Sequence, residues 1–432
     1  MRQGKRIASL LLALSMLGAA GMGYAVDARA ADEVRGSAVY ASGATYSEGL
    51  DARCEIIGYQ RYVGANSGCF PARGDKVAVI SPSELPSRRQ VDAAKSGLAA
   101  WGFVPVEGRH VCPETRTLDE LIEDLTWALN DPEIRAIFCV RGGSGASEVM
   151  DRLPLELIEN AKKPIIGFSD ITVYHSAWTM AGVPSIHGGM NEAFSWNPES
   201  CAEAERHMLL GEIPTYRCRT DTPCVDGTAA GVLIGGNLST FVSVLGTAYD
   251  CTRLDKPYIL FFEDCDDNLR EIHRYLTILK HLGVLDNAAG FLFGEWTGLP
   301  ADGEGNFGAV RGGEFESVAD MIHREFLTDT DIPVAFDFPA GHARVNYPLL
   351  MGGAVKLSVS GGVYTVEMSD AELPARDTVP TAPAVTETPA QAVTNPAAPD
   401  SADSTEPKRC MNESLQWLWY YWFCLFGFAK PA

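Results

Sequence analysis

A repeating pattern of short apolar runs and helical windows constrains the fold more than any other feature of this sequence. Mainly apolar runs occur at 76–81, 103–106, 136–140 and 164–168, and stretches with a helical spacing of apolar side chains separate them. Such runs are typical of strands buried on both faces, and parallel strands are usually connected by helices. The chain is therefore expected to be an α/β protein with a Rossmann-like, mostly parallel sheet in its N-terminal half.

The second half of the chain continues the pattern after a break. A polar, proline-bearing stretch lies near residues 197–230, and apolar strand patterns follow at 257–262, 290–294, 355–359 and 363–368, with a helical window at 269–282. This composition shift predicts an N-terminal domain over 76–200 and a smaller C-terminal α/β domain over 225–370.

The two ends of the chain differ from the middle. Residues 1–30 have a basic start, a short apolar run and small residues before Ala30, which is typical of a cleaved secretory leader; an uncleaved anchor is the alternative. Residues 31–75 are expected to form an N-terminal extension, and the Pro/Ala/Thr-rich segment 371–412 a disordered linker. Within the aromatic tail 413–432, the apolar run 415–428 is too short to span a bilayer as a helix, and we expect the tail to contact a membrane interface. A docking or sorting tail and a functionless tail are the alternatives.

The net charge limits the possible binding partners, and the cysteine content bears on disulfides and metal sites. The formal net charge of −21 disfavours nucleic acid, because acidic chains repel phosphate backbones. Eleven cysteines in an exported chain permit disulfides, and two short loops could each be closed by a pair, Cys54 with Cys69 and Cys218 with Cys224. Cys139 lies within an apolar run and is expected to be an inert core thiol. Histidine and cysteine spacing shows no zinc pattern, so no metal is predicted.

The sharpest local signal is the serine in Ile165-Ile166-Gly167-Phe168-Ser169-Asp170. Ser169 follows a predicted buried strand and precedes a predicted helix, the position at which a tight turn projects a nucleophile from a sheet edge. The helix starting at Asp170 would aim its free N–H groups at the same place, where an oxyanion develops in acyl transfer. The second glycine of the G-x-S-x-G pattern is absent, because Ile171 stands there. A serine that caps a helix is the alternative interpretation.

A serine nucleophile needs a base and an orienting acid. Of the eight histidines, His342 follows Pro339-Ala340-Gly341 just after an apolar stretch, where a strand gives way to a loop. Glu263 closes the apolar run 259–262, and a carboxylate in that position is costly to bury without a partner. An exposed loop histidine and a solvated strand-end acid are the alternatives.

Five blocks in this order resemble the LD-carboxypeptidase family, which includes murein tetrapeptide carboxypeptidases and microcin C immunity-type peptidases. The blocks are Arg141-Gly142-Gly143, Ile166-Gly167-Phe168-Ser169-Asp170, Gly235-Gly236-Asn237-Leu238, Phe262-Glu263-Asp264 and Gly341-His342. The resemblance covers roughly residues 76–368. It implies a catalytic triad of Ser169, His342 and Glu263 and a tendency to form homodimers. It also implies a Rossmann-like N-terminal domain that carries the serine, a smaller C-terminal domain that carries the acid and the histidine, and an active-site cleft between them, which is a common location for a small-ligand site.

The resemblance also implies roles for neighbouring residues. The main-chain N–H groups of Gly143 and Asp170 are expected to bind the oxyanion, and Arg141 and Arg344 are candidates for the substrate carboxylate. Many relatives carry an aromatic residue where this chain has Ser144, so the substrate contacts are expected to differ there. His187 lies in a family-like block, and we expect a structural or site-lining role. The 141–145 loop lacks the spacing of a dinucleotide site, so no cofactor is predicted.

Three functions are compatible with these features. The first is an exported serine LD-carboxypeptidase that removes a terminal D-residue, such as D-alanine, from peptidoglycan stem peptides or muropeptides. The second is a peptidase of the same fold that cleaves peptide–nucleotide conjugates, in which Trp196 could stack a base. The third is a cell-wall binding protein without catalysis, which the presence of Ser169, Glu263 and His342 disfavours.

Overall fold

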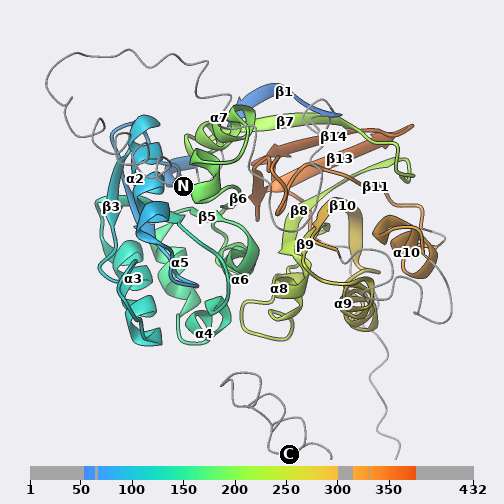
Figure 1. The fold of residues 1–432 in the computed structure, drawn as a ribbon. Coiled ribbons are helices and arrows are strands. Elements are labelled where there is room, and N and C mark those ends of the chain that lie inside the picture. Colours follow the sequence, from blue (N-terminus) through green and yellow to red (C-terminus); the bar gives the residue numbers. More distant parts are fainter. Residues whose placement is uncertain (1–52, 64–66, 300–314, 329, 376–432) are drawn as a thin grey trace, which may run out of the picture. The chain divides into compact units, whose positions relative to one another are not determined.

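Two β-sheets dominate the part of the chain that can be described. The computed structural model describes residues 53–63, 67–299, 315–328 and 330–375. The strands form a six-stranded sheet and an eight-stranded sheet, and helices pack beside each of them (Figure 1). The predicted α/β class with a mostly parallel N-terminal sheet is confirmed.

The six-stranded sheet is built from the apolar runs of the N-terminal half. Its strand order is β12-β6-β5-β4-β2-β3, and all neighbours pair in parallel except β12 with β6. The strands are β2 (Lys76–Ile80), β3 (Val104–Glu107), β4 (Ile134–Cys139), β5 (Ile165–Gly167), β6 (Ser185–His187) and β12 (Leu349–Met351). The helices between them are α2 (Arg88–Ala100), α3 (Leu118–Asn130), α4 (Ala146–Met150), α5 (Leu155–Ala161) and α6 (Thr172–Met180). Capping boxes start α2 and α3 at Ser87 and Thr117.

The strand order fixes where a site can form. The chain runs outward from β2 to β3 and then returns to β4 on the other side of β2. The loops after β2 and β4 therefore diverge at the carboxyl edge of the sheet, which is where ligands bind in open α/β sheets. The loop after β4 is the glycine-rich segment 141–145, and Ser169 follows the next strand, β5.

The eight-stranded sheet is mixed, with the order β1-β7-β14-β13-β8-β9-β10-β11. Its strands are β1 (Cys54–Arg61), β7 (Glu212–Arg219), β8 (Gly227–Asn237), β9 (Tyr258–Cys265), β10 (Ala288–Thr297), β11 (Val334–Ala335), β13 (Ala354–Ser360) and β14 (Val363–Ser369). Strands β8 to β11 are parallel, and β13 and β14 form the antiparallel pair that their alternating sequences predicted. Its helices are α7 (Glu199–Leu209), α8 (Leu238–Val242), α9 (Leu269–His281) and α10 (Val318–Glu325).

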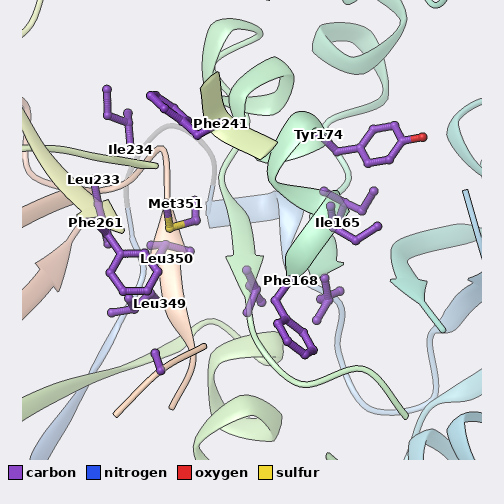
Figure 2. Close-up of a cluster of buried hydrophobic side chains, with 14 of the residues drawn as sticks. Ile165, Phe168, Tyr174, Leu233, Ile234, Phe241, Phe261, Leu349, Leu350 and Met351 are labelled. Carbon is purple, nitrogen blue, oxygen red and sulfur yellow. The ribbon is translucent and has the colours of Figure 1, made fainter. Parts of the chain in front are cut away.

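The two sheets share one apolar core. Phe168 and Tyr174 follow β5, whereas Leu233, Ile234 and Phe261 come from β8 and β9, and Figure 2 shows these side chains in one cluster. Short strand β12 adds Leu349, Leu350 and Met351 to this cluster before the chain continues into β13 of the other sheet. A polar link accompanies the packing, because the Thr172 hydroxyl in α6 accepts a hydrogen bond of 2.9 Å from the N–H of Asn237 at the end of β8. Burial of the cluster therefore holds the carboxyl edge of β5 against that of β8.

Two expectations about the ends of these domains were wrong. The stretch near 197–223 was expected to be a break, but it contains α7 and β7, whose Cys201, Ala204 and Met208 pack into the core. Glu199 and Glu203 lie on the exposed face of α7, whereas Glu205 is buried. Within the expected extension, residues 54–61 form β1, the edge strand that pairs with β7.

The expected disulfides were also wrong. Cys54 is bonded to Cys218, whereas Cys69 and Cys224 are free thiols. Strand register explains the result, because Cys54 and Cys218 are opposite each other in the β1–β7 pair. Local spacing along the chain could not show this pairing between residues 164 positions apart. Cys139 is a buried core thiol, as expected, and burial raises its pKa well above 9.

The described ranges contain neither a membrane-spanning helix nor a cluster of metal-ligating side chains. No helix there is long and apolar enough to cross a bilayer. No group of three or more His, Cys, Asp or Glu side chains there is placed to hold a metal ion. The leader at 1–30, the linker at 371–412 beyond residue 375 and the aromatic tail at 413–432 lie outside the described residues.

Candidate active site

Ser169 lies on a strained turn between β5 and α6. It begins a single 3₁₀ turn, Ser169–Ile171, which leads directly into α6. Its φ angle is +64°, a left-handed conformation that is unfavourable for a residue with a side chain and is concentrated at functional sites. The Ser169 side chain is partly exposed although its neighbours are buried. The turn therefore presents the hydroxyl at the carboxyl edge of the sheet.

The glycine loop after β4 packs directly on this serine. A Cβ atom at Gly142 would lie 2.9 Å from Cβ and 3.2 Å from Oγ of Ser169, so only glycine permits this approach. The next residue, Gly143, has a φ of +109° and is one of the two predicted oxyanion donors. The other is the N–H of Asp170, in the first turn before α6, where main-chain N–H groups lack intrahelical acceptors.

The carboxylate of Asp170 ties these two segments together. One of its oxygens, Oδ2, accepts a hydrogen bond of 3.0 Å from the N–H of Ala146, immediately after the glycine loop. The same oxygen accepts a short hydrogen bond from the hydroxyl of Ser83, and that hydroxyl also lies 3.1 Å from the carbonyl oxygen of Ser144. Burial raises the pKa of Asp170, although these hydrogen bonds act in the opposite direction.

Glu263 and His342 meet although they are 79 residues apart. Nδ1 of His342 lies 2.8 Å from Oε2 of Glu263. Glu263 is a strand residue of β9 with a fully buried side chain, whereas the His342 side chain is 19% exposed and accessible from the site. Gly341 makes the contact possible, because a Cβ atom there would lie 2.7 Å from the same Glu263 oxygen.

An aromatic contact joins this pair to the serine turn. The ring of Phe168, the residue before Ser169, has its centroid 4.8 Å from that of His342. The imidazole therefore lies against the turn that carries Ser169. Of the sequence-predicted residues, Glu263 and His342 are in direct contact, and His342 packs on Phe168, the residue before Ser169.

The electrostatics of His342 suit a base. Burial favours its neutral form, but the Glu263 carboxylate and a hydrogen bond with Cys265 outweigh that effect. The pKa of His342 is consequently raised well above 6.5. A carboxylate bonded to Nδ1 also favours the tautomer in which Nε2 is unprotonated and can accept a proton.

A network of polar side chains fixes the position of β9 next to Glu263. The adjacent Asp264 is buried and accepts hydrogen bonds of 2.8 Å from Nδ2 of Asn237 and from the N–H of Ser239. Asn237 in turn donates its main-chain N–H to Thr172 of α6, three residues after Ser169. This network links the strand that carries the acid to the helix that follows the nucleophile, and it explains the Gly235-Gly236-Asn237 block.

The candidate substrate-binding residues Arg141, Ser144 and Arg344 have partners within the chain. Arg141 forms a 2.7 Å ion pair with Glu84, so its charge is compensated, and the Ser144 hydroxyl lies 3.5 Å from the other oxygen of Glu84. Nε of Arg344 donates to the carbonyl oxygen of Trp196 at 3.3 Å. His187 is fully buried, its ring nitrogens have no hydrogen-bond partner, and burial lowers its pKa well below 6.5.

Two carboxylates near the site were missed in the sequence. Glu84 follows β2 and packs on Gly143, and Glu192 follows β6 in the 3₁₀ turn Asn191–Phe194. The Glu192 carboxylate is close enough to His342 and Arg141 for both to lower its pKa, although burial raises the pKa overall. Strand order alone could have placed both loops at the carboxyl edge, but no local motif marks either residue.

The site can perform acyl transfer through a serine. It has a partly exposed serine on a strained turn, a glycine loop packed on that serine, and a histidine oriented by a buried carboxylate. These groups need neither a metal nor an organic cofactor for their chemistry.

Comparisons with known proteins agree with this geometry. Family models for the LD-carboxypeptidase N-terminal domain and C-terminal domain match residues 77–188 and 230–357. A putative carboxypeptidase of Streptomyces coelicolor is 30% identical over 311 residues, which cover 69% of this chain and 96% of the relative. A probable murein peptide carboxypeptidase of Bacillus subtilis is 27% identical over 311 residues, covering 69% of this chain and 94% of the relative.

Solved structures show the same fold. A muramoyltetrapeptide carboxypeptidase from Oxalobacter formigenes matches with a TM-score of 0.59 and 20% identity, over 68% of this chain and 99% of the other. The microcin C7 self-immunity protein MccF also matches with a TM-score of 0.59, at 19% identity over 69% of this chain and 97% of the other. With both family domains matched and a relative covered almost end to end, the chain belongs to the LD-carboxypeptidase family and is a serine-type carboxypeptidase.

Proposed function

We propose that this protein is an exported LD-carboxypeptidase that hydrolyses the amide bond before a terminal D-amino acid of peptidoglycan stem peptides. The observation that carries the catalytic part is the 2.8 Å contact between Glu263 and His342, with His342 packed against the turn of Ser169. The substrate part is supported by relatives named as murein peptide and muramoyltetrapeptide carboxypeptidases.

The proposed reaction has two stages. Ser169 Oγ attacks the scissile carbonyl while His342 takes the hydroxyl proton, and the N–H groups of Gly143 and Asp170 bind the oxyanion. His342 then protonates the leaving amine, so the terminal D-amino acid departs and the peptide stays esterified to Ser169. Water next attacks the ester with His342 as its base, which releases the shortened peptide and restores the serine. Glu263 stabilises the imidazolium in both stages.

Mass spectrometry tests this function directly. The full chain is incubated with L-Ala-γ-D-Glu-diaminopimelate-D-Ala, beside its Ser169→Ala variant. We expect loss of one alanine with the parent protein and none with the variant, while both give the same circular dichroism spectrum. Turnover by both would refute Ser169 as nucleophile. A folded parent that releases no alanine would refute the stem-peptide substrate, and peptide–nucleotide conjugates would be the next substrates to assay.

Export is supported by the disulfide. Cys54 and Cys218 form a disulfide in the described part of the chain, and stable disulfides are characteristic of oxidising compartments. The expected leader at 1–30 agrees with this location. Alkylation of cell fractions without reductant tests the proposal: we expect Cys54 and Cys218 to resist a thiol reagent in the exported pool. Reactive Cys54 and Cys218 in protein that stays inside the cell would contradict it.

A further inference from the structure

An unsatisfied carboxylate oxygen lies beside the candidate active site. Oε1 of Glu192 accepts a hydrogen bond of 2.9 Å from Nδ2 of Asn191, but Oε2 is buried and has no hydrogen-bond partner. Burying a charged acceptor without a hydrogen-bond donor is energetically costly. Buried polar groups are nearly always paired, so such an oxygen calls for a donor that the free chain does not supply.

The position of Glu192 ties it to the reacting groups. Nδ2 of Asn191 also lies 3.2 Å from the carbonyl oxygen of Val140, the residue before Arg141 and the glycine loop. This contact places the Glu192 carboxylate next to the end of β4. His342 and Arg141 both lie close enough to this carboxylate to lower its pKa.

The charges around Glu192 indicate which kind of group could donate a hydrogen bond to its Oε2. Arg141 is already paired with Glu84, and no salt bridge in the described ranges involves Glu192 or its buried neighbour Glu205. Glu205 has its own oxygen without a partner, Oε1, and the two carboxylates interact. An anionic group would be repelled here, whereas an ammonium group supplies both a donor and a compensating charge.

We propose that Glu192, held by Asn191, is the subsite for an ammonium group on the substrate residue that contributes the scissile carbonyl. This inference rests on the proposed peptidase function. In this proposal the carbonyl of that residue lies at Ser169, and its side chain or its α-nitrogen reaches the loop after β6. A diamino acid before the terminal D-residue carries a side-chain ammonium, whereas a free dipeptide carries an α-ammonium. Glu192 therefore acts in specificity, and the bond cleaved is the same with either source.

Matched peptides test the side-chain source. The full chain is assayed with L-Ala-γ-D-Glu-L-Lys-D-Ala and with the same peptide carrying norleucine, which lacks only the ammonium group of lysine. We expect kcat/KM to be about 10- to 100-fold higher for the lysine peptide, as a charge-assisted hydrogen bond implies. In Glu192→Gln this ratio should fall to within about threefold of unity. In Glu192→Lys the preference should be reversed.

A second pair of peptides identifies the source. Norleucyl-D-alanine with a free amino terminus is compared with its N-acetyl form. A preference for the free amine that disappears in Glu192→Gln, with no lysine preference, would assign the subsite to an α-ammonium. Each ratio is taken on one protein preparation, so it does not depend on the fraction that is folded. Glu203→Gln, which removes an exposed carboxylate of α7, is the control and should keep the parental ratios.

Two outcomes would overturn the subsite. One is equal kcat/KM for the charged and uncharged peptides in the parent chain, which would mean that Oε2 of Glu192 holds only water. The other is a charge preference that survives in Glu192→Gln. Titration calorimetry of the Ser169→Ala full chain with the same peptides measures the preference as a ratio of Kd. Its result decides the subsite even if no peptide is hydrolysed, an outcome that would refute the proposed function alone.

Discussion

The two halves of the candidate site are built in different ways. The nucleophile half consists of Ser169, the glycine loop 141–145 and Asp170, which come from neighbouring strands β4 and β5 of one parallel sheet. It is shaped by backbone conformation: a positive φ at Ser169 and glycines that allow close approach. The acid–base half consists of Glu263 and His342, which come from β9 of the other sheet and from the loop between β11 and β12 that connects the two sheets. It is shaped by burial and charge.

Because of this difference, the two halves should respond differently to pH and to substitution. A backbone turn is fixed by packing and hydrogen bonds, so pH should affect it little while Asp170 stays ionised. A buried ion pair depends on both protonation states, and removing one partner leaves the other uncompensated. Changes in the acid–base half should therefore be larger and pH-dependent, whereas changes around the nucleophile should act on geometry.

The largest effect is expected for Glu263→Gln. The amide cannot stabilise an imidazolium and can hold His342 in the wrong tautomer, and the corresponding change in Ser-His-acid triads costs about 10⁴ in kcat. We expect a loss of roughly 10³–10⁴ in kcat for release of the terminal D-residue, with the parental circular dichroism spectrum. A loss of less than tenfold would show that the two halves do not function as one triad.

The pH dependence of kcat/KM tests the acid–base half separately from the nucleophile half. His342 must be neutral to accept the serine proton, and the pKa of His342 is raised above 6.5. The value of kcat/KM should therefore rise with pH, with a midpoint above 6.5, and fall about tenfold per unit below it. Glu263→Gln should move that midpoint of the activity profile to lower pH.

The raised pKa of His342 also stabilises the folded protein below pH 6.5, and this contribution to stability is lost as pH rises through the folded-state pKa. A midpoint at or below 6.5 in the parent would contradict this account.

A smaller effect is expected for Asp170→Asn. The change keeps the size of the side chain but removes the charge that accepts from Ser83 and Ala146, so the glycine loop should lose its fixed position beside Ser169. We expect kcat to fall by about 10- to 100-fold with KM within about threefold, because oxyanion donors act in the transition state. Ser83→Ala, which removes one of the two donors, should cost less. An unchanged kcat in Asp170→Asn would show that the loop is held by other contacts.

The same contrast explains what could be predicted from the sequence. Ser169 was identifiable locally, because a buried strand, a glycine and a helix start occur within six residues. Glu263 and His342 were weak local signals, and the order of the family-like blocks identified them. The pairing of Cys54 with Cys218 and the partners of Arg141 could not be predicted, because they depend on strand register and on which loops meet at one sheet edge. Glu192 carries no motif at all.

The smallest effect on activity is expected for the disulfide. Cys54→Ser with Cys218→Ser removes a cross-link between residues 164 positions apart, and loss of a long-loop disulfide typically lowers the free energy of unfolding by about 2–4 kcal/mol. Strands β7, β14, β13 and β8 separate β1 from β9, which carries Glu263, so kcat/KM should stay within about twofold of the parent. Denaturant unfolding and the tetrapeptide assay on the same sample measure both quantities. A large loss of kcat/KM in a folded double variant would mean that the edge strand supports the acid–base half, and the separation between stability and catalysis would not hold.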